Sequence, residues 1–324
     1  MGQDFGFAFT DDLLAEVGQV PQSKLHLDVE AISKAYEAVG PVARRLGVEP
    51  PAPRLAGFCY THLVALGCRV VYSENAEPTV QPLIHSLREI DELEEPEDYL
   101  ANEVIQQRIR ICEELQRRYP ESPSTIGHLL EGPTTTATIL MGPAFFTLPY
   151  DDPERAQRLL DFCSQSAVNY AHSIKKYFGR PIEPGRKYFP DDFAGIFGPD
   201  KFKEFVVPYW EKTYQRLMAR GRSVHSELLR TEHLPFLKEL QMDHFDPGAD
   251  QYLTPEILSR HCPCKFSGRI LSWHIHDLSA EELERMYRNI AKYEPTSISF
   301  SMCRLEEEPK IKHLLKVARQ MQDN

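Results

Sequence analysis

The chain has 324 residues, of which 42% are hydrophobic and 26% charged, with 37 basic and 48 acidic side chains and a formal net charge of -11. This acidic balance, with no clustered basic segment, argues against nucleic acid or an anionic membrane as the main partner. The hydrophobic content is sufficient for one large core, so we expect a single domain.

The N-terminus and the cysteine content indicate the compartment. Residues 1–6 carry no basic segment followed by an apolar stretch, and no run approaches the roughly 18 apolar residues of a membrane span. The seven cysteines are an odd number scattered over the chain, which favours free thiols over a disulfide framework. We therefore expect a soluble, cytoplasmic protein.

Helix-period segments alternate with short strand-like runs along the chain. The predicted helices cover residues 27–46, 97–118, 153–178 and 199–218, and two more begin at residues 280 and 309. The predicted strands cover residues 55–60, 68–72, 125–130, 191–196, 224–229, 244–246, 266–271 and 297–303.

Several of these helices carry clear signals at their ends. Asp152 is expected to cap the third helix, with Pro153 in its first turn, and Ser279 with Glu282 forms a capping box before the fifth. Pro208 falls inside the fourth helix and is expected to kink it.

The β/α alternation over one domain predicts an α/β fold, either a parallel barrel or a doubly wound sheet. In both architectures the functional sites lie at the C-terminal ends of the strands. The sequence contains no internal repeat, no phosphate-binding loop and no dinucleotide-binding glycine pattern. Functional residues are therefore expected at the predicted strand ends.

Three residues at such ends form a candidate metal site. His225 and Glu227 are two apart in a predicted strand and would share one face, and Cys303 ends the last predicted strand. Imidazole, carboxylate and thiolate are all zinc ligands, and three protein ligands with one open position are typical of catalytic zinc. The alternative is a core histidine, a solvated glutamate and a small buried cysteine.

Other polar residues near predicted strand ends are candidates for substrate binding or catalysis. Tyr60, His128 and Glu131 would line the substrate pocket, although His128 fits a core histidine equally well. Asp191 or Asp192 would donate a proton or orient a metal ligand. The alternative for these two aspartates is a capping or loop-stabilising role.

Two further short motifs have more than one interpretation. Trp273 is a candidate for substrate binding, and His274 with His276 has metal-ligand spacing, which makes a rival metal pair. The alternative for this segment is a loop with aromatic packing. Cys262 and Cys264 are too close together for the usual two-residue zinc spacing.

Several segments, in order, resemble the uroporphyrinogen decarboxylase superfamily. Residues 131–142, which begin Glu-Gly-Pro-Thr, resemble the end of a barrel strand and the helix that follows it, and residues 151–160 resemble the next helix. Residues 191–209 are similar to the aspartate-containing loop and its Val-Pro-Tyr helix. The resemblance implies a (β/α)8 TIM barrel over residues 55–324, with residues 1–54 as an N-terminal helical extension packed on it.

The superfamily contains two activities, and the sequence resembles one branch more. Decarboxylases carry an arginine-rich segment near the N-terminus that binds the carboxylates of a tetrapyrrole, but residues 1–24 contain no arginine. Zinc methyltransferases that act with corrinoid proteins carry a His-x-Cys motif and a late cysteine. His225 and Cys303 match that pattern, and Glu227 stands in place of the first cysteine.

This resemblance implies Zn²⁺ and a corrinoid (cobalamin) carried by a separate protein, because no Asp-x-His-x-x-Gly corrinoid-binding pattern occurs in the chain. A carboxylate in place of a thiolate makes a harder ligand set that suits an oxygen donor. We therefore hypothesise corrinoid-dependent O-demethylation of a methoxylated, aromatic substrate, with zinc as Lewis acid on the ether oxygen. The alternatives are a metal-free decarboxylase and an inactive barrel that serves as a binding subunit.

Overall fold

The structure is a computed structural model that describes residues 3–122, 124–127 and 130–323. The strands are β1 (Phe5–Phe9), β2 (Val70–Ser73), β3 (Ala76–Val80), β4 (Gly185–Pro190), β5 (Ala219–His225), β6 (His244–Asp246), β7 (Lys265–Phe266), β8 (Gly268–Arg269) and β9 (Ile298–Met302). The α-helices are α1 (Asp11–Gly18), α2 (Val29–Leu46), α3 (Thr61–Ala65), α4 (Leu87–Asp91), α5 (Glu103–Arg118), α6 (Pro133–Met141), α7 (Leu148–Asp151), α8 (Pro153–Tyr177), α9 (Pro199–Phe205), α10 (Val207–Arg216), α11 (Leu234–Glu239), α12 (Pro255–His261), α13 (Ser272–Asp277), α14 (Ala280–Ala291) and α15 (Glu308–Gln322).

The barrel strands are parallel and form two hydrogen-bonded arcs, β4-β5-β6-β7 and β8-β9-β1. The arcs are joined through Thr296, whose N–H donates to the Phe266 carbonyl at 2.7 Å. Residues 55–59 and 124–127 have no strand pairing, and Gly132 donates to the Pro190 carbonyl at the end of β4. The architecture is a (β/α)8 TIM barrel, as the family resemblance implies, and β2 and β3 form a separate antiparallel hairpin.

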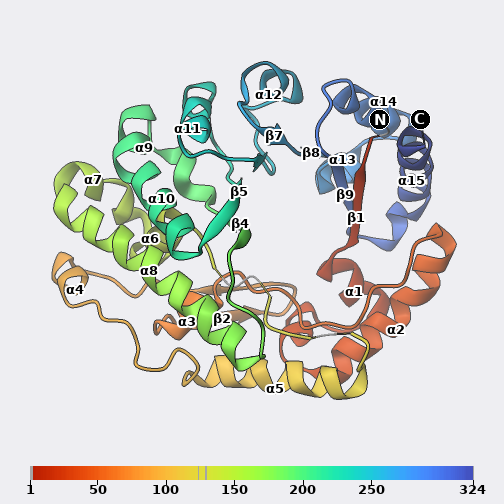
Figure 1. Cartoon of the computed structure of the whole chain (residues 1–324). Coiled ribbons are helices and arrows are strands. Elements are labelled where there is room, and N and C mark those ends of the chain that lie inside the picture. Colours follow the sequence, from red (N-terminus) through yellow and green to blue (C-terminus); the bar gives the residue numbers. More distant parts are fainter. Residues whose placement is uncertain (1–2, 123, 128–129, 324) are drawn as a thin grey trace.

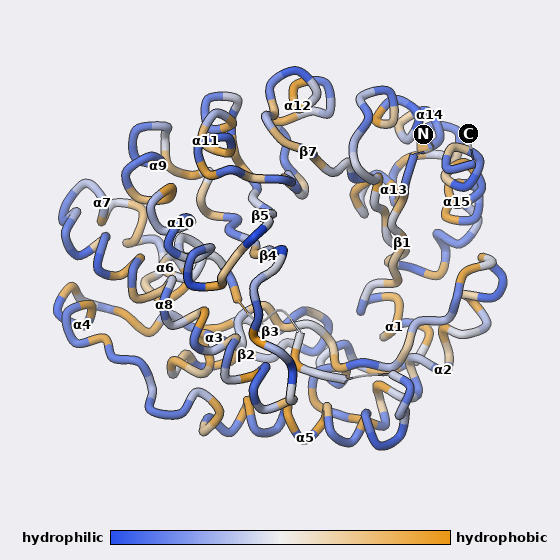
Figure 2. The backbone as a smooth tube through the Cα atoms, viewed as in Figure 1, coloured by the Kyte–Doolittle hydropathy of each residue, from blue (hydrophilic) through white to orange (hydrophobic). Residues whose placement is uncertain are grey.

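Figure 1 shows β1, β4 and β5 around the centre and the longer helices around the outside, with the two chain ends side by side. The ends are held together by the Gln3 N–H, which donates to the Met321 carbonyl at 2.9 Å. Hydrophobic and hydrophilic residues alternate along α5 and α8 in Figure 2, as expected for helices that bury one face. No helix in the described part of the chain is long and apolar enough to cross a membrane.

The helix signals read from the sequence are confirmed. Asp152 caps α8 by accepting from the Arg155 N–H at 3.1 Å, and Ser279 and Glu282 form the capping box of α14. Pro208 lies in the first turn of α10, and the predicted kink is a break between α9 and α10 at Val206.

The strand predictions are less accurate, and the segment before residue 55 needs a correction. It contributes helices and also β1, which pairs with β9 from Phe5↔Ile298 to Phe9↔Met302, so it is part of the barrel wall. The strand predicted at 191–196 is wrong, because β4 ends at Pro190 and residues 192–196 form a 3₁₀ helix. Residues 55–60 are not a strand, and β5 ends at His225 rather than at residue 229.

Candidate active site at the barrel mouth

His225 is the last residue of β5, and two neighbouring segments place a carboxylate on each of its ring nitrogens. Nδ1 is 3.2 Å from Asp246 Oδ2 at the end of β6, and Nε2 is 3.1 Å from Asp192 Oδ1, just after β4. The strand register pairs His225 with both Pro190 and Asp246. Parallel strands that end together therefore bring the three side chains to one point.

Glu227 lies close to this group, as predicted from its spacing to His225. Its Oε1 is 4.0 Å from His225 Nε2 and accepts from the Ala249 N–H at 2.8 Å. Gly248 has φ +60, and a Cβ there would collide with both His225 Cε1 and Glu227 Oε1. Only glycine combines this backbone conformation with such a close approach, so the turn after β6 fits tightly around the pair.

The two carboxylates control the charge of the imidazole. Burial by itself lowers the pKa of His225, but the bonds to Asp192 and Asp246 outweigh it and raise this pKa to about 10. Burial raises the pKa of Asp246, but the contacts with His225 and Arg269 outweigh it and lower this pKa to about 2. Asp246 is also held by Arg269 Nη2 at 2.9 Å and by the Gly248 N–H at 3.0 Å. The arrangement fixes the ring orientation of His225.

The donor atoms around His225 Nε2 match zinc in kind, since an imidazole nitrogen and the carboxylates of Asp192 and Glu227 are all ligands that zinc accepts. They are not spread around a common point, because Asp192 Oδ1 lies against the imidazole itself, 3.1 Å from Nε2. Within the described residues, no three His, Cys, Asp or Glu side chains stand in a geometry that would hold a metal ion. A metal ion bound at His225 Nε2 would take the place of the proton on that nitrogen.

Cys303 lies on the other side of the mouth. It follows β9, and β6, β7 and β8 stand between it and His225 in the strand order. Its side chain lines a cavity of about 560 Å³ together with Thr10, Asp12 and Arg269. Among the described residues it has no bond to His225 or Glu227, but Arg269 connects its cavity to Asp246. The structure thus brings two of the three predicted ligands together.

The two aspartates of the predicted catalytic loop have different positions. Asp191 is fully buried and accepts from Trp210 Nε1 and from the Thr135 N–H, both at 2.6 Å. It therefore fixes the start of α6, which is the capping role considered as its alternative. Asp192 faces His225 and is 42% exposed, so it is the one that can meet a substrate.

Glu131 lies in the same neighbourhood and is 5% exposed, with no hydrogen-bond partner for Oε2 in the described part of the chain. Burial, with Asp192 and Asp191 nearby, raises the pKa of Glu131 well above its usual range. Burial and Glu131 together raise the pKa values of Cys59 and Tyr60 to about 12. A carboxyl group that stays protonated can donate a proton. His128 lies outside the described residues.

The segment around Trp273 is helical, which changes its interpretation. Trp273, His274 and His276 all belong to α13, and helical residues two apart do not share a face. The rival metal pair is therefore wrong: His274 Nδ1 accepts from the Leu271 N–H, and His276 lies 3.9 Å from Glu306. Trp273 is 51% exposed and does not line the cavity beside Cys303.

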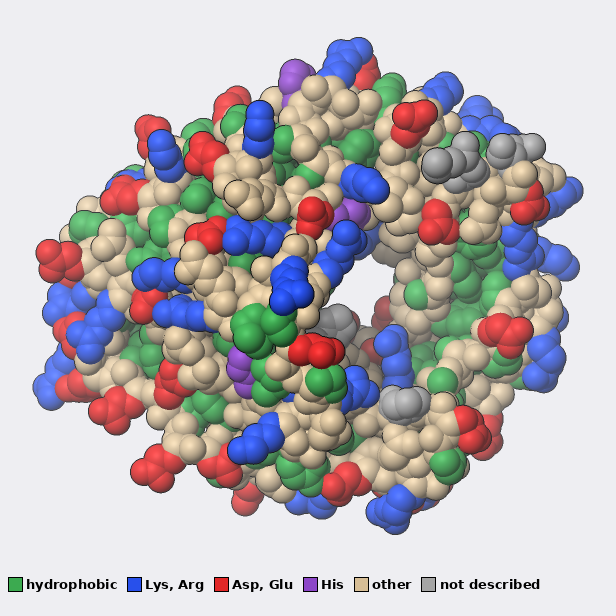
Figure 3. Space-filling view, viewed as in Figure 1, with side chains coloured by type: hydrophobic (Ala, Val, Ile, Leu, Met, Phe, Trp, Pro, Cys, Tyr) green, Lys and Arg blue, Asp and Glu red, His purple; other side chains and the backbone are tan. Residues whose placement is uncertain are grey.

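Sequence reasoning did not identify Asp246, Arg269, Gly248 or Cys59 as site residues. The signal for Asp246 was present, because it ends the strand predicted at residues 244–246. Gly248 and Arg269 gave no local signal, since their importance depends on what the fold places beside them. Figure 3 shows a hollow at the centre of the ring of strands and helices, seen as in Figure 1.

Comparison with known proteins agrees with this architecture. The family model of uroporphyrinogen decarboxylase (URO-D) matches residues 43–256, more than half of the chain. A methyltransferase from Methanosarcina mazei superposes with a TM-score of 0.71 at 15% identity, over 98% of this chain and 94% of that one. A thiamine phosphate pyrophosphorylase from Pyrococcus furiosus reaches a TM-score of only 0.23 at 8% identity, over 49% of this chain and 77% of that one. The search of curated proteins found no match. The chain belongs to the uroporphyrinogen decarboxylase family.

Proposed function

We propose that the protein is a zinc-dependent methyltransferase, which moves a methyl group from a methoxylated, aromatic donor to the cobalt(I) of a separate corrinoid protein. The observation that carries this proposal is the arrangement at His225, whose Nδ1 is held by Asp246 while Nε2 faces Asp192 and Glu227. A carboxylate behind the imidazole and oxygen donors in front of it are typical of a histidine that binds a metal. The resemblance to a methyltransferase in fold is consistent with this activity class.

His225 and Glu227 are the proposed zinc ligands, with Cys303 as the third. Asp192 is the rival for the third position, because it already contacts His225 Nε2. Bound zinc would supply Lewis acidity toward the ether oxygen of the donor. Asp246 keeps the Nδ1 proton of His225 in place, so that Nε2 is free to act as a ligand.

Glu131 is the proposed proton donor, and Asp191 positions the loop that carries Asp192. When the methyl carbon–oxygen bond breaks, the methyl group goes to cobalt and the oxygen keeps the electron pair. The protonated carboxyl of Glu131 then supplies the proton that converts the leaving phenolate into a phenol. Tyr60 and Trp273 remain proposed substrate contacts, as does His128.

The charge of the mouth favours a neutral donor over a polyanionic tetrapyrrole. The carboxylates of Asp192, Glu227 and Asp246 all lie around His225. Their field opposes a substrate that carries several carboxylates. This argues against the metal-free decarboxylase. The metal analysis described next tests that alternative, together with an inactive binding subunit.

The test is metal analysis of chelator-free protein for the wild type and five variants. We expect about one zinc per chain in the wild type, and its loss in His225→Ala and Glu227→Ala. The third ligand is the residue whose replacement, Cys303→Ala or Asp192→Ala, also removes the zinc. His274→Ala is the matched control and should keep its zinc.

Zinc that stays bound in both His225→Ala and Glu227→Ala would overturn the ligand assignment. Absence of zinc from the folded wild type would leave two possible functions, a metal-free decarboxylase and an inactive binding subunit. If zinc is bound as expected, single-turnover absorbance of cobalt(I) cobalamin with a methoxyaromatic should show methyl-cobalt formation, and a failure with every methoxyaromatic would refute the donor class.

A further inference from the structure

Two cysteines outside the barrel mouth lie side by side. Cys262 is the C-cap residue of α12, and Cys264 immediately precedes β7. Their Sγ atoms are 3.7 Å apart, within hydrogen-bonding range for sulfur. They lie at the amino end of β7, whereas His225 and Asp246 lie at the carboxyl ends of β5 and β6. The pair is therefore at the opposite end of the barrel from the candidate active site.

The backbone holds the two thiols in this arrangement. Cys262 has φ -71 and ψ 124, and the chain bends at Pro263 and Cys264, which brings the two sulfurs to 3.7 Å from each other. On one flank the Cys262 N–H donates to the Leu258 carbonyl at 2.8 Å, and on the other the Lys265 N–H donates to the Asp243 carbonyl at 3.2 Å. Both ends of the Cys-Pro-Cys turn are thus anchored to α12 and to the sheet.

The pair is accessible to small molecules. Both cysteines are half-buried, and they line an open cavity of about 780 Å³. Its other lining residues include Asp243, Ser259, Tyr293 and Glu294. By contrast, Cys68, Cys112 and Cys163 are buried in the core. The geometry therefore sets Cys262 and Cys264 apart from the core thiols.

We propose that Cys262 and Cys264 form a redox-active dithiol, which reacts with small-molecule disulfides and closes to an intramolecular disulfide. The Cys262 thiolate attacks one sulfur of the small disulfide, that sulfur–sulfur bond breaks, and the first thiol leaves. Cys264 then attacks the Cys262 sulfur and releases the second thiol. The dithiol loses two electrons and two protons, and the small disulfide gains them as two thiols.

The surroundings assign different roles to the two sulfurs. The hydrogen bond from the Cys264 thiol lowers the pKa of Cys262, whereas the same bond, burial and the Asp243 carboxylate raise the pKa of Cys264. Cys262 is thus the attacking thiol and Cys264 the one that resolves the mixed disulfide. Closure brings the sulfurs from 3.7 Å to a bond of about 2.05 Å, a side-chain movement within an anchored turn.

The experiment uses the full chain and oxidised glutathione as the probe. After incubation and acid quenching, remaining thiols are alkylated and the protein is digested with trypsin. Cleavage after Arg260 and Lys265 yields the peptide His261–Lys265, which contains both cysteines and no others. We expect this peptide to appear as an internal disulfide, with no alkyl group on either cysteine. A peptide that stays fully alkylated, while glutathione disulfide is in excess, would overturn the proposal.

Two single variants test the roles. Cys264→Ser should accumulate one glutathionyl group on Cys262, because nothing resolves it. Cys262→Ser should react at least about tenfold more slowly, because its remaining thiol is the less acidic one. Equal rates in the two variants would contradict the assignment of Cys262 as the attacking thiol. Cys68→Ser is the matched control, and the wild-type disulfide must still form in it.

Discussion

At the scale of single residues, His225 is the point on which the site depends. Each of its ring nitrogens lies within ion-pair distance of a carboxylate, so in the metal-free protein it is a largely buried cation between Asp192 and Asp246. A metal that binds Nε2 must displace a proton that these carboxylates stabilise. Metal affinity and protein stability are therefore linked through one proton.

The first prediction concerns the stability of metal-free protein against pH. The folded pKa of His225 is raised from 6.5 to about 10, so its stabilising contribution is complete below pH 6.5 and is lost as pH rises through about 10. We expect the free energy of unfolding of the wild type to fall between these two pH values. In His225→Gln this fall should be smaller, which urea unfolding at a series of pH values measures. An identical pH profile in the variant would contradict the ion-pair interpretation.

A second prediction concerns proton donation by Glu131. Glu131→Gln keeps the shape of the side chain but cannot act as an acid, so we expect kcat for demethylation to fall by about 10²- to 10⁴-fold. Zinc content should be unchanged, because Glu131 is not a proposed ligand. Glu77→Gln is the control, as Glu77 is a carboxyl on β3 whose pKa is also raised by burial. Equal losses in both variants would point to general electrostatics instead of proton transfer.

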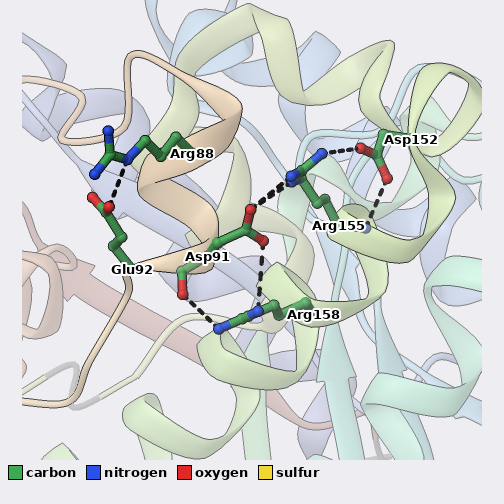
Figure 4. Close-up of polar contacts among 6 residues, drawn as sticks. All are labelled: Arg88, Asp91, Glu92, Asp152, Arg155 and Arg158. Atoms are coloured by element: carbon green, nitrogen blue, oxygen red, sulfur yellow. Dashed lines mark hydrogen bonds and ion pairs between the residues drawn. The ribbon is translucent and has the colours of Figure 1, made fainter.

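At the scale of elements, α8 is anchored at its start by charge as well as by its cap. Figure 4 shows Arg155 between Asp152 and Asp91, with Arg158 on the other side of Asp91. Arg155 Nη2 is 2.7 Å from Asp91 Oδ2, so the network ties α8 to the end of α4. Asp191 plays a comparable part for α6 by accepting from its first N–H groups.

The third prediction follows from this network. Asp91→Ala removes the shared acceptor of Arg155 and Arg158, and we expect a small decrease in Tm that is greater at low than at high salt. Arg88→Ala is the control, because its pair with Glu92 is exposed and lies within one segment. Thermal unfolding at low and at high salt measures the decrease in Tm for both variants. A larger effect of Arg88→Ala would show that Asp91 does not link the helices.

At the scale of the whole molecule, the barrel wall is completed by joining the two ends of the chain. Phe300 on β9 is 2% exposed. Its ring centroid lies 6.2 Å from that of Phe5 and 5.6 Å from that of Phe7, both on β1. Its ring also contacts Tyr287 on α14. These contacts fix the N-terminal strand against a strand almost the full chain length away. The stability of the fold therefore depends on its first ten residues.

The fourth prediction tests this junction. Phe300→Ala should lower the free energy of unfolding by about 3–5 kcal/mol, because a large buried side chain leaves a cavity. Leu305→Ala is the control, since Leu305 is 39% exposed and should change stability little. Denaturant unfolding measures both. A loss at Phe300 no greater than at Leu305 would mean that the β1–β9 contact does not support the barrel.

Local sequence patterns were sufficient to predict the helix caps and to identify two residues of the candidate site. Asp152 and Ser279 cap the helices they were expected to cap, because a cap involves side chains and N–H groups only three residues apart. The β/α alternation and the family segments indicated the barrel. His225 and Glu227 were recognisable together because they are neighbours along the chain as well as in space.

The tertiary structure decided everything that joins distant segments. The pairing of Phe5 with Ile298, the carboxylate of Asp246 on His225 Nδ1 and the separation of Cys303 from His225 all follow from strand order. Strand pairing needs a partner whose position local sequence does not encode, which is why β1 was missed. Local signals specify the helices and their caps, whereas the strands and the surroundings of His225 depend on pairing between distant segments.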